Sequence, residues 1–150
     1  MPALITFGRI VFAVLFIYSG ATDLFGIQAA AASIEAKVTI PELLAPYAAQ
    51  LQTITGMPTS QTLAIAAGAF QIIAGLMIAL NFGARFFAIL MIIYVGFETF
   101  YFHDFWNQTP PDNAQTLIDA LKNLSIIGAL FMIAGFGRGT EIAESAYGDV

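Results

Sequence analysis

Four long apolar stretches divide this sequence, and their length is the property that most constrains the fold. The stretches cover residues 4–25, 62–80, 84–103 and 116–136. Each approaches the ~20 residues that an α-helix needs to cross ~30 Å of hydrocarbon. Inside lipid every backbone N–H and C=O group must bond within the protein, and a helix satisfies these groups within one segment. The sequence therefore predicts an all-α integral membrane four-helix bundle, with residues 1–150 forming one domain.

Composition supports lipid as the solvent and excludes several kinds of site. The chain is 59% hydrophobic and 10% charged, whereas soluble domains are about 45–50% apolar and about 25% charged. It has no cysteine, which excludes thiol redox chemistry, disulfides and cysteine-ligated zinc or iron–sulfur clusters for this chain alone. It has one histidine, so a bis-histidine haem would need a partner chain. The net charge of −5 and the lack of a basic tract make nucleic acid an unexpected partner, and no metal site is predicted.

The positions of the cations predict the orientation in the membrane. Arg9, Arg85 and Arg138 lie on one side of the four stretches, whereas Lys37 and Lys122 lie on the other. Because cytoplasmic loops carry the excess of Lys and Arg, both termini are expected in the cytoplasm. The first cation is Arg9, so the start lacks the basic region of a signal peptide, and the first stretch is expected to be retained.

Residues 26–60 form a long segment on the outer side, between the first two stretches. The alanine-rich residues 28–38 are expected to form a short helix. A second helix is expected to begin at Pro41 and to be disturbed by Pro46. Its apolar residues recur at helical spacing: Leu43, Leu44, Tyr47, Leu51 and Ile54. We interpret it as an amphipathic helix on the bilayer surface; the alternative is a lid over a site or a docking face for another subunit.

Small and polar residues in the second stretch indicate contacts with other helices. Residues 81–83 are expected to form a tight turn into the third stretch. Gln71 lies near the middle of the second stretch, where a lone amide is more typical of a bond between helices than of catalysis. Small residues four positions apart predict close helix approach: Ala64 with Gly68, and Gly75 with Ala79.

Two charged residues of the last two stretches lie at similar expected depths. Glu98 is about 8 Å, and Lys122 about 9 Å, below the outer ends of their stretches at 1.5 Å per residue. An unpaired charge at the bilayer centre would cost about 2.5–3.5 kcal/mol on insertion scales. A Glu98–Lys122 pair would relieve that cost. The alternative is pairing of Asp119 with Lys122 within one helix, at i, i+3.

Further polar and aromatic residues are expected at the same outer level, including Asp23 and Asn107. Individually they have simpler explanations: Trp106 and Tyr101 as an interfacial aromatic belt, His103 as a helix-end residue, and Lys122 reaching toward the surface. Together they predict a functional pocket. The candidate catalytic residues are Glu98, His103, Asp104 and Lys122, and the candidate cofactor-binding residues are Tyr101, Trp106 and Asn123.

The sequence resembles the DoxX family in several motifs. FHDFW at residues 102–106 is followed by LKNLSIIGAL at 121–130, with Gly8-Arg9 in the first stretch and FGAR at 82–85. The resemblance implies a four-helix protein of the bacterial inner membrane. It also implies a link to quinone-coupled oxidation of sulfur compounds and to membrane oxidoreductase assemblies. The polar residues carried over from the family pattern are His103, Asp104, Trp106, Lys122 and Asn123.

The chain departs from the family pattern at two positions. Asp23 stands where members often have a lysine, and Gln71 stands where they often have a glutamate. Glu98 is a candidate replacement for that carboxylate.

Two functional hypotheses follow. The first is a component of a membrane oxidoreductase assembly with a quinone bound near the outer ends of the last two helices. Phe97, Phe100, Tyr101 and Phe105 would form its apolar slot, and His103 or Lys122 would donate hydrogen bonds. Glu98 and Asp104 would relay protons. Other subunits, or a homo-oligomer, are the expected partners besides the bilayer. The second hypothesis is a non-catalytic accessory subunit. A transporter is a weaker third, because no internal repeat is visible.

Overall fold

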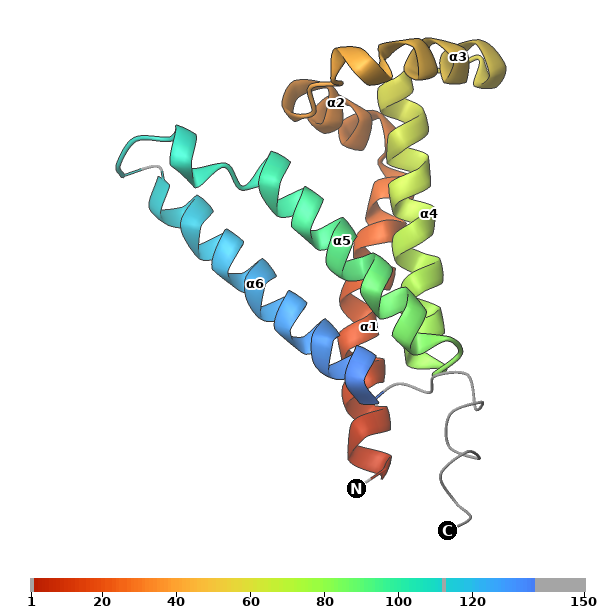
Figure 1. Ribbon diagram of the computed structural model, residues 1–150, viewed down its shortest axis with the longest axis vertical. Helices are drawn as coiled ribbons and strands as arrows, with labels where there is room; N and C mark the ends of the chain where they lie inside the picture. The colour runs from red at the N-terminus through yellow and green to blue at the C-terminus, as the bar shows by residue number, and fades with distance from the viewer. Residues whose placement is uncertain (1, 112, 137–150) are drawn as a thin grey trace. The chain divides into compact units, whose positions relative to one another are not determined.

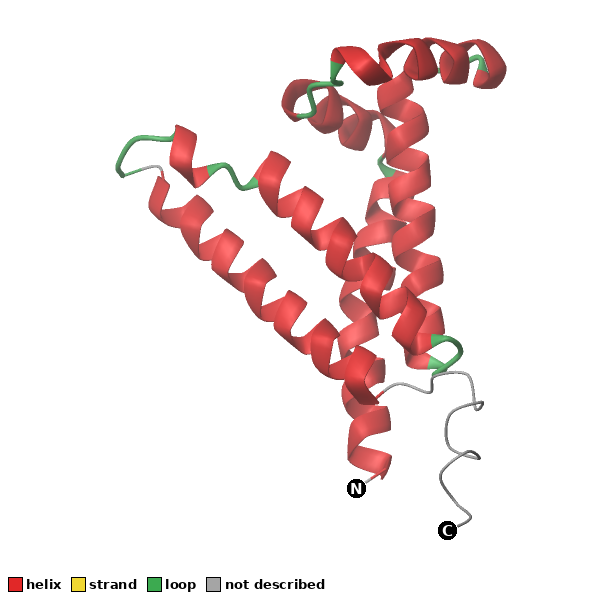
Figure 2. Cartoon of the chain, in the orientation of Figure 1, coloured by secondary structure: helices red, strands yellow, loops and turns green. Residues whose placement is uncertain are grey.

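The computed structural model describes residues 2–111 and 113–136, and all the regular elements in that part of the chain are helical. Figures 1 and 2 show them in chain order. The α-helices are α1 (Pro2–Phe25), α2 (Ile27–Lys37), α3 (Ala45–Thr55), α4 (Thr59–Ala79), α5 (Ala84–Phe102) and α6 (Asn113–Phe136). Two 3₁₀ turns, η1 (Glu42–Leu44) and η2 (Phe105–Asn107), precede α3 and α6. The predicted all-α class is confirmed.

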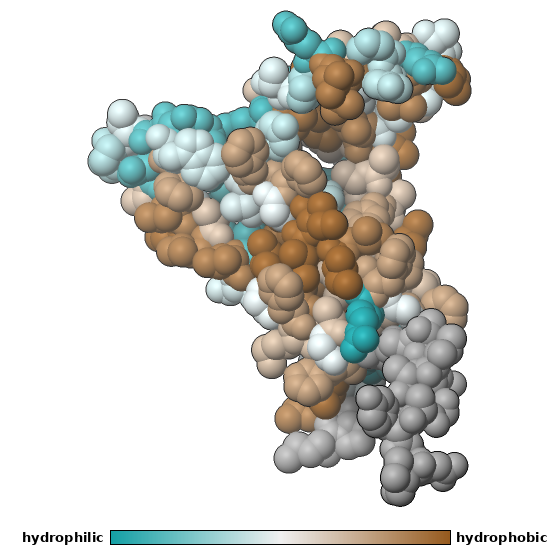
Figure 3. All heavy atoms as spheres, in the orientation of Figure 1, coloured by the Kyte–Doolittle hydropathy of each residue, from teal (hydrophilic) through white to brown (hydrophobic). Residues whose placement is uncertain are grey.

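The helices α1, α4, α5 and α6 are long and apolar enough to cross a membrane. Three of them begin two or three residues earlier than the apolar stretches, and in α4 and α6 the added first-turn residues are mainly polar. Their surfaces are largely hydrophobic (Figure 3). Phe86, Phe97 and Phe131, for example, are about three-fifths exposed in the isolated chain. Such exposure is expected of side chains that face acyl chains rather than water. Arg138 lies outside the described residues.

The chain divides into two compact units. The α2–α3 unit comprises residues 15–73, and the α5–α6 unit comprises residues 1–14 together with 74–150.

In the α2–α3 unit, α1 and α4 approach closely at two glycines. A Cβ atom on Gly20 would overlap the carbonyl oxygen of Gly68 and lie 2.9 Å from Cβ of Gln71. A Cβ atom on Gly68 would lie 2.9 Å from the carbonyl oxygen of Gly20 and 3.0 Å from Cγ of Leu24. Close backbone approach at small residues is how helices pack tightly in membranes. Gly68 was one of the residues expected to do this; its partner Gly20 was not.

The segment after α1 forms two short helices that lie by the first turns of α4 (Figure 1). The alanine-rich helix is confirmed as α2, but the expectation for the prolines is wrong. Pro41 precedes the 3₁₀ turn η1, and Pro46 lies in the first turn of α3. A first-turn N–H has no partner within its helix, so a proline there removes no helical hydrogen bond. Pro46 therefore starts α3 rather than disturbing it.

Helix α3 carries exposed apolar side chains at both ends. Tyr47 is 68% exposed and Ile54 is 74% exposed, and Leu43 in the preceding turn is 82% exposed. Gly56 ends the helix in the left-handed conformation, with φ of 68°. Placement of α3 on the bilayer surface remains a prediction.

In the α5–α6 unit, α5 and α6 pack along each other. The buried face of α5 is made by two alanines, a methionine and a valine: Ala84, Ala88, Met91 and Val95. On α6 the buried residues are Ala120 and Leu130. Where α5 begins and α6 ends, Arg85 Nε donates a 2.9 Å hydrogen bond to the carbonyl oxygen of Ala134 in the last turn of α6. A cation at a helix C-terminus also interacts favourably with the helix dipole.

The turn between α4 and α5 is tight, as expected. Asn81 and Gly83 both take the left-handed conformation, with φ of 57° and 59°. The N–H of Phe82 donates to the carbonyl oxygen of Met77 at 2.9 Å, which closes the end of α4.

We predict that Gly20→Ala destabilises the protein by about 1–3 kcal/mol, because the added methyl group meets the backbone of α4. The measurement is thermal unfolding in detergent, followed by circular dichroism. Gly8→Ala, in the same helix, is the matched control because its Cβ would meet nothing within 4 Å. Equal melting temperatures for the two variants would contradict the close approach of α1 and α4.

Candidate functional site

The candidate site begins where α5 ends. His103 is the C-cap residue of α5, and its N–H donates to the carbonyl oxygen of Thr99 at 3.0 Å. Its own carbonyl oxygen accepts from the N–H of Phe105 at 2.9 Å. The interpretation of His103 as a helix-end residue is therefore confirmed for its backbone.

The side chain of Asp104 organises the segment after α5. It accepts hydrogen bonds from Nδ2 of Asn107 at 3.4 Å and from Nε2 of Gln108 at 3.3 Å. The amide oxygen of Gln108 in turn accepts a 2.7 Å bond from the hydroxyl of Thr116 in the first turns of α6. This chain of three side chains connects the end of α5 to the start of α6.

A hydrogen bond between two side chains also joins α5 and α6 directly. Nδ2 of Asn123 donates to Oγ1 of Thr99 at 2.9 Å, and that hydroxyl donates to the carbonyl oxygen of Val95 at 2.7 Å. Thr99 and Asn123 are both half-buried. Because the hydroxyl hydrogen is used within α5, the oxygen is free to accept the amide, and the arrangement fixes both side chains.

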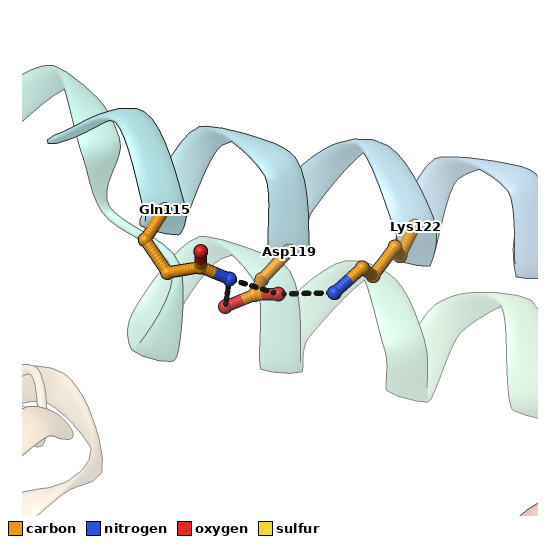
Figure 4. A network of polar contacts seen from close by, with 3 residues as sticks. All are labelled: Gln115, Asp119 and Lys122. Carbon is orange, nitrogen blue, oxygen red and sulfur yellow. Dashed lines mark hydrogen bonds and ion pairs between the residues drawn. The ribbon is translucent and has the colours of Figure 1, made fainter.

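A second polar group lies on α6 and is shown in Figure 4. Nζ of Lys122 lies 2.9 Å from Oδ1 of Asp119, and Nε2 of Gln115 lies 3.2 and 3.3 Å from the two carboxylate oxygens. The lysine side chain is 64% exposed and the aspartate side chain 33% exposed. His103 is close enough to the Asp119 carboxylate to interact with it electrostatically. The alternative of pairing within one helix is thus confirmed, whereas a Glu98–Lys122 pair remains a prediction.

Aromatic rings gather beside these polar groups. The ring of Phe100 lies 5.6 Å from that of Trp106 and 5.2 Å from that of Tyr101, and Phe105 lies 5.0 Å from Trp106. Phe100 is 59% exposed and Trp106 is 50% exposed. Edge-to-face and tilted contacts at such distances stabilise aromatic groups. An aromatic group at the end of a spanning helix is also what an interfacial belt requires.

The candidate residues therefore divide among distinct contacts. Asn123 bonds to α5, Asp104 bonds to the loop, and Lys122 bonds along α6. Glu98 is half-buried and lies about 100° around α5 from Thr99.

The residues that link α5, the loop and α6 in these bonds include some that were not among the candidates, namely Thr99, Gln108 and Thr116. Thr99 had a detectable signal, because it follows Met91 and Val95 at intervals of four on the buried face of α5.

A further buried polar contact lies in the α2–α3 unit. Gln71 is 3% exposed, and its Nε2 donates a 2.9 Å hydrogen bond to Oδ2 of Asp23. This confirms Gln71 as a bond between helices. Gln71 lies twelve residues after Thr59, so Asp23 meets α4 about 18 Å along the helix. Asp23 therefore lies beside the middle of α4 rather than level with its outer end, because the first turns of α4 extend beyond α1 to meet α2 and α3.

Comparison with known proteins identifies the family. The DoxX family model matches residues 4–104, which is more than half of the chain. This chain belongs to the DoxX family. It is also similar to the inner membrane protein YphA of Escherichia coli (strain K12), with 31% identity over 90 residues. That match covers 60% of this chain and 64% of YphA. No solved structure matches.

The DoxX assignment and the four apolar helices make the chain a multi-pass protein of the inner membrane. The side on which the termini lie remains a prediction. The two departures from the DoxX pattern, Asp23 and Gln71, are bonded to each other. They therefore form a pair of side chains in contact rather than two unrelated differences.

We predict that Asn123→Leu destabilises the α5–α6 pair by about 0.5–2 kcal/mol, the range of hydrogen bonds between membrane helices. The measurement is reversible unfolding in mixed detergent micelles. Thr99→Val should give a similar loss, and the double variant should lose little more than either single variant, because both remove the same bond.

Ser125→Ala is the control, since the Ser125 hydroxyl donates to the Leu121 carbonyl of its own helix. Strictly additive losses for Asn123→Leu and Thr99→Val would contradict a direct bond between them.

Proposed function

We propose that this DoxX-family chain is an accessory component of a membrane oxidoreductase assembly. The connection to oxidoreductases comes from the family resemblance. The accessory role is supported by one observation: the polar side chains at the outer end of α5 and α6 hydrogen-bond to one another. Asn123 bonds to Thr99, Thr116 bonds to Gln108, and Lys122 bonds to Asp119.

Such mutual bonding is typical of a structural role. A binding site has to present donors and acceptors to its ligand, whereas these groups use theirs to hold α5, the loop and α6 together. The four helices would then act as a scaffold, and the chemistry would belong to a partner subunit. The chain itself has no cysteine and a single histidine, so a haem or cluster would need ligands from that partner.

A second candidate function is a quinone-linked site at the same place. It is favoured by the aromatic group of Phe100, Phe105 and Trp106, in which Phe100 and Trp106 are exposed and which lies on the same loop and helix end as His103. A quinone needs an apolar slot for its ring and tail and polar groups at its two carbonyl oxygens. Lys122 and His103 would donate, and Glu98 and Asp104 would carry protons.

One experiment separates the two functions. We predict that Glu98→Gln combined with His103→Gln leaves the quinone content of the purified protein unchanged and leaves its migration on native gels in mild detergent unchanged. Quinone is measured by extraction and chromatography. Loss of a bound quinone in this variant, with the migration retained, would instead support the quinone-linked site.

The accessory role also predicts co-migration with a larger complex when membranes are solubilised gently. A wild-type chain that migrates alone and by itself reduces or oxidises an added quinone would contradict it. Photo-crosslinks from a quinone analogue to α5 and α6 would do the same.

A further inference from the structure

A cavity of about 230 Å³ lies in the α2–α3 unit, where α2, α3 and the first turns of α4 meet (Figure 1). Four apolar side chains line it: Ile34 and Val38 on α2, Ile40 in the segment after α2, and Leu63 on α4. Pockets for drug-sized ligands have volumes of about 300–1,000 Å³. This cavity therefore suits a smaller molecule, whose hydrocarbon part would contact these four side chains.

The polar side chains of the lining have groups that the chain itself does not use. Glu35 lines the cavity from α2, Gln52 from α3 and Ser60 from α4. Within the described part of the chain, none of these three side chains makes a hydrogen bond or an ion pair. Glu35 and Gln52 are also exposed, so a ligand can reach them. The cavity thus presents its polar groups to a ligand, whereas the polar groups at the outer end of α5 and α6 bond to one another.

The charge of the lining favours a cation. Among the described residues that line the cavity, Glu35 alone carries a formal charge. Lys37 follows it by two residues and therefore projects about 160° away from it around α2. The N-terminus of α4 contributes about half a positive charge, which is smaller than the full negative charge of the Glu35 carboxylate.

Two other kinds of ligand fit this lining less well. A metal ion needs several oxygen or nitrogen ligands, and the described part of the chain has no group of three or more His, Asp or Glu residues that could hold one. An uncharged hydrocarbon would cover Glu35, Gln52 and Ser60 without bonding to them, and polar groups that leave water without a hydrogen bond cost free energy. The lining is complementary to a molecule that has both a cationic donor and a hydrocarbon part.

We propose that this cavity binds a primary ammonium group carried on a short hydrocarbon chain. An ammonium group has three N–H donors, which would bond to the Glu35 carboxylate and to the side-chain oxygens of Gln52 and Ser60. Such a group occurs in free organic amines and in the ethanolamine headgroup of a phospholipid. The site is independent of the accessory role, because the hydrogen bonds that support that role lie in the α5–α6 unit.

The test uses hexylammonium as the probe and the full chain in dodecyl maltoside micelles. Binding is measured by isothermal titration calorimetry, with the heat for empty micelles subtracted. Glu35→Gln should weaken binding by about tenfold or more, the loss expected when a hydrogen bond to a charged group is removed. Glu42→Gln is the matched control, because Glu42 lies in η1 of the same unit and is not among the lining residues. Equal affinities for the wild type and Glu35→Gln, or an equal loss in both variants, would overturn the proposal.

A second probe, 1-hexanol, separates the contribution of the charge from that of the hydrocarbon chain. It should bind to the wild type about tenfold more weakly than hexylammonium, because it cannot form a charged hydrogen bond. Glu35→Gln should remove most of this difference, since the two probes then meet the same uncharged lining. A preference for hexylammonium that persists in Glu35→Gln would overturn the role of this carboxylate and with it the proposal.

Nanodiscs distinguish the two sources of the ammonium group. Phosphatidylcholine has a quaternary ammonium without N–H donors, whereas phosphatidylethanolamine has a primary one. Weaker hexylammonium binding in discs that contain phosphatidylethanolamine than in discs of phosphatidylcholine alone would assign the cavity to the lipid headgroup. Equal binding in both would assign it to a free amine. No binding of hexylammonium in either kind of disc would overturn the proposal.

Discussion

Peptide groups in hydrocarbon have no water to bond with, and this constraint determines the architecture. Each spanning segment bonds its N–H and C=O groups within its own helix. The apolar side chains of α1, α4, α5 and α6 are then free to face outward, as the exposure of Phe86 and Phe131 shows. The helix ends are where the constraint relaxes. There the chain uses left-handed residues such as Gly56 and Asn81, and backbone bonds such as the one from His103 to Thr99, to complete the last turns.

The hydrophobic effect does not drive these helices together, because lipid tails are as apolar as leucine side chains. Their association therefore needs another source of free energy. Each unit combines close packing with polar bonds. In the α2–α3 unit, Gly20 and Gly68 bring two backbones into contact, and a buried Gln71–Asp23 bond lies beside them. In the α5–α6 unit, Thr99 and Asn123 are joined by a side-chain bond, and small residues such as Ala88 and Ala120 are buried. Close packing and polar bonding therefore act together in both.

Properties that depend on one segment could be predicted from the sequence, because run length and hydropathy are local. The four long helices, α2 and the tight turn at residues 81–83 are of this kind. Pairings between segments were harder, because they depend on how each helix is rotated about its axis. Gln71 was correctly predicted to join helices, but Asp23 could not be named as its partner. Thr99 was missed because a hydroxyl on an apolar face can equally bond to its own helix, as it also does here. The prolines were misassigned because the start of α3 moves by four residues when η1 precedes it.

The contact between Arg85 and the last turn of α6 has a consequence for studies of topology. Arg85 is one of the cations that predict the orientation, and its Nε also holds the carbonyl oxygen of Ala134. Removing this charge in order to invert the membrane orientation of the protein would also remove the hydrogen bond that joins the first turn of α5 to the last turn of α6. A loss of correct insertion in such a variant would mix a translocation effect with a folding effect. The side chain of Arg9 donates a hydrogen bond to the hydroxyl of Thr6 in its own helix, so Arg9 is the better position for relocating charge.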